Sequence, residues 1–230
     1  MRRARTLAGL VMLVGLCAGP VLAASTVKYV GPGKTGTQNI SGVGTVYAGE
    51  MRYENYDVPG LETGSFVSFC IEVNEHVNQG TLYDAVVSDS ARNGGAGGPS
   101  PDPLSNSTAW LYNNYLDNVA SVSTNTLAKD YQLAIWYLEE EIASSLLTTG
   151  AQGLVQTALG HSDWVNERIV VLNLYGYGTS ESCNPVYKQD CLARVASSTP
   201  VVPAPSSMLL GSIGVMFVGW LRSRRSAGTL

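Results

Sequence analysis

A run rich in glycine and proline between residues 93 and 103, with the sequence NGGAGGPSPDP, divides this chain into two unlike parts. Such a run does not favour a regular helix or strand, because glycine is conformationally free and proline lacks an amide hydrogen. Before it, alternating apolar residues predict strands at 26–30, 43–53, 65–73 and 81–87, with turns at 31–33, 57–60 and 78–80. The first part is therefore predicted to be a sheet.

The part that follows has the three- and four-residue spacing of apolar side chains that indicates helices. Ser105 begins a capping sequence for a first helix, a second helix is predicted over residues 125–147, and a short third over residues 152–159. Residues 168–175 return to strand character and are expected to close the sheet. The predicted fold class is α+β, a β-sandwich or barrel with a helical insertion, within residues 24–195.

Both ends of the chain carry signals for export. Residues 1–23 combine an arginine-rich start, an apolar run and a small-residue cleavage site, which predicts a secretory signal peptide. Cys17 does not indicate a lipoprotein, because Leu16 is bulky where such signals need a small residue. Residues 196–205 predict a Pro/Ser linker before a tail at 206–230. The apolar stretch in that tail, 208–221, is shorter than the ~20 residues that cross a bilayer comfortably as a helix.

The tail resembles the PEP-CTERM sorting signal of Gram-negative bacteria. The residues that carry the resemblance are Val202, Pro203 and Pro205 in the motif and Arg222, Arg224 and Arg225 in the basic end. Ala204 stands where the family has glutamate. The resemblance implies recognition by an exosortase, removal of the tail, and delivery to the cell surface or outside the cell, often alongside exopolysaccharide. The alternative is a plain C-terminal membrane anchor with its arginines in the cytoplasm.

The charge distribution argues against nucleic-acid binding. The formal net charge is −4, but six of the 14 basic residues are arginines in the first five or last nine residues. The body between them has 8 basic against 18 acidic residues, a net charge of −10. A body of this charge repels phosphate backbones.

Cysteine and glutamine supply the most specific candidate site. Cys183 and Cys191 enclose a seven-residue loop and are expected to form a disulfide in an oxidising compartment. Cys70 is then left without a partner, in a predicted strand. Gln132 is a single neutral amide on the apolar stripe of the second helix, with Ile135 and Trp136. A buried amide needs a hydrogen-bond partner, so the question is whether Gln132 meets Cys70.

Two motifs, Phe69-Cys70 and residues 131–136 (YQLAIW), resemble the signatures of the thioester domains of Gram-positive surface adhesins. Tyr131 departs from the threonine usual in that family. The resemblance implies a bond between the Cys70 sulfur and the Gln132 side-chain carbonyl carbon, with Phe69 and Trp136 among the aromatic residues that exclude water. It implies a single-use adhesin rather than an enzyme. Such an adhesin acylates an amine or hydroxyl of a surface target and needs no cofactor.

A noncovalent reading stays open beside it. Cys70 is then a small apolar residue, Gln132 bonds to backbone, and the protein is a matrix or carbohydrate-binding module whose tyrosines and tryptophans offer stacking surface. His76 lies ~20 Å from Cys70 if the intervening chain is extended, which argues against a Cys-His enzyme. His161 is expected at a helix boundary, and residues 139–141 (EEE) on a solvated helix face. Glu72 and Glu75 do not have a metal-ligand spacing, and no metal site is predicted.

Overall fold

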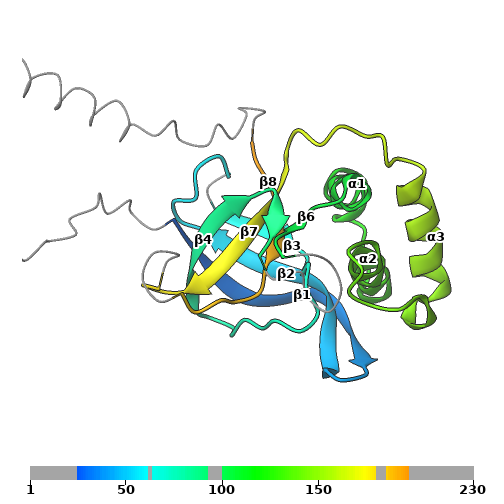
Figure 1. The fold of residues 1–230 in the computed structure, drawn as a ribbon, viewed down its shortest axis with the longest axis horizontal. Coiled ribbons are helices and arrows are strands. Elements are labelled where there is room, and N and C mark those ends of the chain that lie inside the picture. Colours follow the sequence, from blue (N-terminus) through cyan, green and yellow to red (C-terminus); the bar gives the residue numbers. More distant parts are fainter. Residues whose placement is uncertain (1–24, 62–63, 93–99, 180–184, 197–230) are drawn as a thin grey trace, which may run out of the picture.

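The computed structural model describes residues 25–61, 64–92, 100–179 and 185–196, which form a β-barrel with helices packed against one side (Figure 1). Six antiparallel strands follow one another in the order β3-β2-β1-β4-β7-β8. They are β1 (Thr26–Ile40), β2 (Gly44–Asn55), β3 (Gly64–Ser68), β4 (Leu82–Ser88), β7 (Ile169–Gly176) and β8 (Cys191–Arg194). The predicted fold class, α+β with a barrel and a helical insertion, is confirmed.

The two edge strands, β3 and β8, approach each other and nearly close the barrel. Two isolated bridges cross this seam, one from Leu61 to Val195 and one from Cys70 to Cys191. The prediction that residues 168–175 close the sheet is wrong, because β8 pairs with β7 and reaches the β3 side. Closure satisfies backbone groups that an open sheet edge would expose. Cys70 therefore lies at the place where the barrel closes.

The β1–β2 hairpin is longer than the alternating runs suggest. The predicted turn at residues 31–33 is wrong, because these residues lie inside β1, where the register shifts between Tyr29 and Gly31 and again between Pro32 and Thr35. Bulges accommodate the glycine and proline that break a regular ladder. Gly49 is needed opposite this irregular segment, because a Cβ atom there would lie 2.5 Å from the Lys34 carbonyl oxygen.

The helical insertion contains α1 (Asn106–Asn114), the π-helical turn η1 (Tyr115–Val119), α2 (Asn125–Leu138), the 3-10 turn η2 (Ser144–Leu146) and α3 (Thr149–Leu159). Each α-helix begins with a hydroxyl cap, from Ser105, Thr124 and Thr148 respectively. Each hydroxyl accepts a hydrogen bond from an amide that the helix itself cannot satisfy. The short helix predicted at residues 152–159 is confirmed and begins slightly earlier.

The second predicted helix ends nine residues early, at Leu138. Glu140 adopts a left-handed φ of 62°, its N–H donates to the Tyr137 carbonyl, and the Glu141 N–H donates to the Trp136 carbonyl. This pair of bonds is a Schellman motif with glutamate in the position that usually holds glycine. The expectation of three solvated carboxylates on a helix is wrong, since Glu139 and Glu141 are buried beyond the helix end.

Two short strands flank the glycine- and proline-rich run. β5 (Ser90–Ala91) pairs with β6 (Asp102–Pro103), so the expectation of no regular structure is wrong at residues 102–103. The predicted signal peptide, the tail and nearly all of the linker lie outside the described residues. Within the part of the chain that the structure describes, no helix has both the length and the apolar character to span a membrane.

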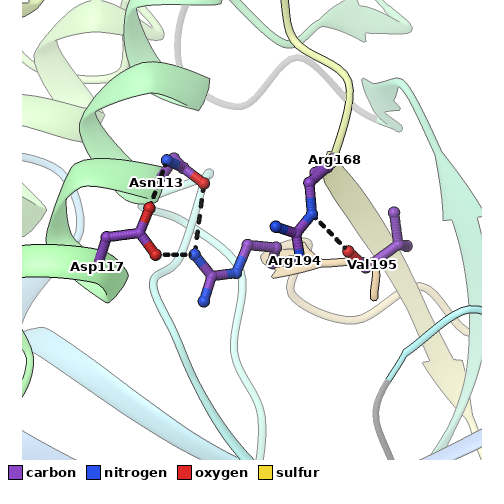
Figure 2. A network of polar contacts seen from close by, with 5 residues as sticks. All are labelled: Asn113, Asp117, Arg168, Arg194 and Val195. Carbon is purple, nitrogen blue, oxygen red and sulfur yellow. Dashed lines mark hydrogen bonds and ion pairs between the residues drawn. The ribbon is translucent and has the colours of Figure 1, made fainter. Parts of the chain in front are cut away.

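Polar contacts attach β8 to the helical insertion (Figure 2). Arg194 of β8 pairs with Asp117 of η1, and it also donates to the Asn113 side-chain oxygen at 3.4 Å. Arg168, just before β7, donates to the Val195 carbonyl at 3.1 Å. Because Asp117 is about half exposed, the Arg194–Asp117 pair contributes little stability. The pair links β8, the strand that begins with Cys191, to η1 of the insertion.

Candidate functional site

Cys70 and Gln132, 62 positions apart in the sequence, meet in the protein interior. The Cys70 N–H donates to the Gln132 Oε1 atom at 3.1 Å, and Gln132 Nε2 donates to the Cys70 carbonyl at 2.8 Å. Gln132 is fully buried, and both polar atoms of its side chain hydrogen-bond to the backbone of Cys70. These two bonds bring Gln132 to the Cys70 backbone, and contact between the carboxamide and the Cys70 sulfur stays a prediction.

The position of Cys70 at the barrel seam explains why it needs this amide. On one side, Cys70 pairs with Cys191 across the seam. The hydrogen bonds of this pair are made by the residues before and after Cys70. In such a pair, the N–H and C=O of Cys70 itself point away from β8. Gln132 of α2 supplies an acceptor and a donor there, as a further strand would. The carboxamide therefore completes the hydrogen bonding of the strand at this point.

The same contact places a hydrogen-bond donor on the oxygen of the Gln132 carbonyl group. Negative charge develops on Oε1 when a nucleophile adds to the side-chain carbonyl carbon, and the Cys70 N–H already donates to that oxygen. A backbone amide in this position acts as an oxyanion-hole donor in acyl transfer. Nε2 is the atom that would leave as ammonia. The Cys70 thiol and this backbone donor belong to one residue.

The Cys70 sulfur lies in an apolar setting. Its Sγ atom lies 3.0 Å from the Met51 Sδ atom and is almost completely buried. Burial raises the pKa of the Cys70 thiol well above its ordinary value, and the neighbouring Cys191 raises it further. The side chain is therefore a neutral thiol at physiological pH, and any reaction through sulfur requires loss of this proton.

Aromatic side chains surround the pair. Phe69 is fully buried and meets the Tyr115 ring edge-on, with ring centroids 4.8 Å apart. Trp136 is also buried, and its indole Nε1 has no hydrogen-bond partner among the described residues. That Phe69 and Trp136 surround a thioester stays a prediction. The Gln132 side chain between α2 and the barrel is itself fully buried.

One small pocket of about 190 Å³ opens beside the site. Cys70, Trp136, Met51, Glu75 and His76 are among its lining residues. The assumption of an extended chain between Cys70 and His76 is wrong, because the chain bends after Cys70 and brings His76 to the same pocket. His161 follows the end of α3, as expected, and stacks on Trp110.

An acidic cluster next to the pocket is absent from the sequence-based prediction. Carboxylate oxygens of Glu72, Glu75 and Asp190 lie within 4.8 Å of one another. Oxygen ligands of this kind suit hard cations. Glu72 and Glu75 alone gave no recognisable spacing because the third residue comes from the distant segment before β8. The Asp190 N–H also donates to Glu75 Oε2 at 3.2 Å.

Asp190→Asn should weaken the pH dependence of stability. Burial, with the nearby Glu75 charge, raises the pKa of Asp190 to about 7, although Arg92 opposes the shift. The folded protein then holds this proton more tightly than the unfolded chain, so the stabilising contribution is present at low pH and lost as the pH rises through about 7. Lowering the pH from about 7 to about 5 should stabilise the wild type by about 2 kcal/mol more than the variant. Urea unfolding at the two pH values measures this difference, and equal pH responses would contradict it.

Some of the remaining predicted residues lie in the part of the chain that the structure describes, and others lie outside it. Cys191 is a free thiol, fully buried at the barrel seam. Cys183 lies outside the described residues, so the disulfide between them stays a prediction. The sorting residues at 202–205 and 222–225 also lie outside the described residues.

No protein-family model matches the sequence, and no curated protein matches it. Among solved structures, this chain is similar to the N-terminal thioester domain of a surface protein from Clostridium perfringens, in a cysteine-to-alanine mutant. The TM-score is 0.42 and the sequence identity is 15%, and the match covers 63% of this chain and 87% of that chain. The site is therefore inferred from its own contacts.

Proposed function

We propose that this protein is an exported surface or matrix protein that attaches covalently to a target through a thioester between Cys70 and Gln132. The observation that carries the proposal is the hydrogen bond from the Cys70 N–H to Gln132 Oε1. It places the carboxamide beside the cysteine and activates the carbonyl group that the sulfur must attack. The burial of both residues supports a bond that lasts until a partner arrives.

Formation of the thioester is one intramolecular acyl transfer. The Cys70 Sγ atom forms a bond to the Gln132 side-chain carbonyl carbon, and the bond from that carbon to Nε2 breaks. The thiol proton leaves with Nε2, which departs as ammonia. Because the Gln132 carboxamide is already hydrogen-bonded to the backbone of Cys70, the step is intramolecular and loses little entropy of association. The raised pKa of the Cys70 thiol slows the step and makes it faster at alkaline pH.

The thioester is then consumed by its target. A primary amine or a hydroxyl attacks the same carbonyl carbon, the bond to sulfur breaks, and Cys70 regains a proton. The product is an amide or ester between Gln132 and the target, so the protein reacts once and has no turnover. The pocket that Cys70 and Trp136 line is the route by which the target group reaches the bond.

Delivery to the surface follows from the two ends of the chain. The signal peptide at residues 1–23 directs export, and the tail at 206–230 is proposed to bring the protein to an exosortase at the membrane. The charge of the body and the sequence of the tail favour a target among surface amines, hydroxyls or exopolysaccharide over nucleic acid.

One observation favours a second function. The two hydrogen bonds between the Gln132 side chain and the Cys70 backbone form a clamp on Cys70. They satisfy both polar atoms of the Gln132 side chain without any covalent bond, so the clamp is complete as a structural feature. On that reading the protein is a noncovalent matrix or carbohydrate-binding module with an unreactive Cys70.

Capture of a labelled amine separates the two functions. Incubation with a biotin-labelled primary amine should label wild-type protein at Gln132, as located by peptide mapping, and should leave Cys70→Ala unlabelled. Cys183→Ala serves as the matched cysteine control and should label like the wild type under reducing conditions. Absence of labelling in folded wild-type protein, or equal labelling of Cys70→Ala, would reject the covalent function.

A further inference from the structure

The bridge between Cys70 and Cys191 has the geometry of a cross-strand disulfide site. The Ile71 N–H donates to the Asp190 carbonyl at 3.1 Å, and the Leu192 N–H donates to the Phe69 carbonyl at 3.0 Å. These bonds flank the two cysteines, which therefore form a non-hydrogen-bonded antiparallel pair. Cα atoms of such a pair lie about 4.5 Å apart with both side chains on one face. That separation is within the range of about 4.4–6.8 Å found across disulfides.

The two sulfurs also share one compartment inside the barrel. The Cys70 Sγ atom contacts the Met51 Sδ atom at 3.0 Å. The Tyr53 hydroxyl lies 3.8 Å from the Met51 Sδ atom. The Tyr53 hydroxyl also hydrogen-bonds to the Cys191 thiol. Cys70 and Cys191 are both free thiols and both buried. Each is therefore directed toward the space around Met51 and Tyr53.

We propose that Cys70 and Cys191 form an intramolecular disulfide when the protein meets an external disulfide, and that this bond is the alternative fate of the Cys70 sulfur. The disulfide itself stands on the strand pairing. Its effect on adhesion rests on the proposed thioester, because one sulfur cannot bond to Gln132 and to Cys191 at once. Oxidation then yields a form of the protein that cannot attach to a target, and reduction of the disulfide restores the form that can.

The oxidant is a disulfide, and the exchange balances in two steps. The Cys70 thiolate attacks one sulfur of the external disulfide, which releases one thiol and leaves a mixed disulfide on Cys70. The Cys191 thiolate then attacks the Cys70 sulfur and displaces the second thiol. Two protein thiols are oxidised, and the external disulfide is reduced to two thiols. Cys70 reacts first because it lines the pocket, whereas Cys191 is fully buried.

The environment of the thiols sets the rate. Burial raises the pKa of Cys191 to about 12, although hydrogen bonds from Ser68 and Tyr53 oppose the shift. Burial likewise raises the pKa of the Cys70 thiol. Few molecules carry a thiolate at neutral pH, so exchange is slow there and faster in alkaline buffer. The pair therefore responds to prolonged exposure rather than to brief contact with an oxidant.

The test maps the cysteines of the full chain after exposure to oxidised glutathione. The protein is first treated with methylamine, which opens any thioester and frees Cys70. Remaining thiols are then alkylated and the protein is digested without reductant. The expected result is a pair of peptides joined through Cys70 and Cys191, lighter by two hydrogens than the separate peptides and released by reductant. Cys183→Ala should give the same linked pair.

The outcomes separate this inference from the proposed function. Linkage of Cys191 to Cys183 with alkylated Cys70, or alkylation of both Cys70 and Cys191, would overturn the disulfide. Wild type folded without methylamine and in the presence of oxidised glutathione, so that the two thiols are oxidised before a thioester forms, should capture no amine until reductant is added. Cys191→Ala, which has no second thiol to displace glutathione, should under the same conditions carry a glutathione adduct on Cys70 and give no linked peptides. If the disulfide forms in a protein that never captures an amine, the disulfide proposal stands and the thioester proposal is rejected.

Discussion

Gln132→Glu should lower the free energy of unfolding by about 3–5 kcal/mol at neutral pH, because it leaves a buried charge without a partner. The amide donates to the Cys70 carbonyl at 2.8 Å, and a carboxylate oxygen in that place would face another oxygen. Full burial of Gln132 removes water as a substitute partner. The loss should diminish at low pH, since a protonated carboxyl can donate to the Cys70 carbonyl.

Urea unfolding of Gln132→Glu at two pH values measures this effect. Gln156→Glu is the matched control, because Gln156 lies on the exposed face of α3. A surface change of this kind should alter stability by no more than about 0.5 kcal/mol. Equal stability of the two variants would show that the buried clamp on Cys70 contributes nothing, and would remove the structural basis of the site.

Phe69→Ala should destabilise the protein by about 3–5 kcal/mol, the usual cost of removing a large buried aromatic side chain. Phe69 is fully buried, and its ring meets Tyr115 at 4.8 Å and Tyr112 at 6.2 Å, both edge-on. These rings attach the segment before Cys70 to α1 and η1. The truncation therefore leaves a cavity beside the site and loosens the position of Cys70 relative to Gln132.

Thermal and urea unfolding compare Phe69→Ala with Tyr177→Ala. Tyr177 is 64% exposed, so its truncation should change stability by no more than about 0.5 kcal/mol. Amine capture by Phe69→Ala, measured under conditions where the variant is folded, should be slower than by Tyr177→Ala. Wild-type stability and capture in Phe69→Ala would contradict the role given to this aromatic cluster.

The sequence was sufficient for the broad architecture and for the pair at its centre. Alternation of apolar residues identified the β-rich half, and helical spacing identified α2 with Gln132 on its apolar stripe. The meeting of Gln132 with Cys70 came from an unsatisfied amide and a motif resemblance. It did not come from sequence spacing, because a separation of 62 residues along the chain does not determine the distance between them in space.

Other features depend on contacts that local patterns do not encode. β8 has only four residues, too few for a recognisable alternation, and it forms because β7 and the seam need a partner. α2 ends at a Schellman motif in which Glu140 replaces the glycine that would have marked it. Asp190 joins Glu72 and Glu75 only once β8 has been placed.

Intact mass of the reduced, natively purified protein tests the central claim most directly. A Cys70–Gln132 thioester makes the chain lighter by one ammonia than its sequence requires, and methylamine should add its full mass in the same molecules. Cys70→Ala, prepared in the same way, should show the mass that its sequence requires and no response to methylamine. A wild-type chain at full mass, unchanged by methylamine, would contradict the account.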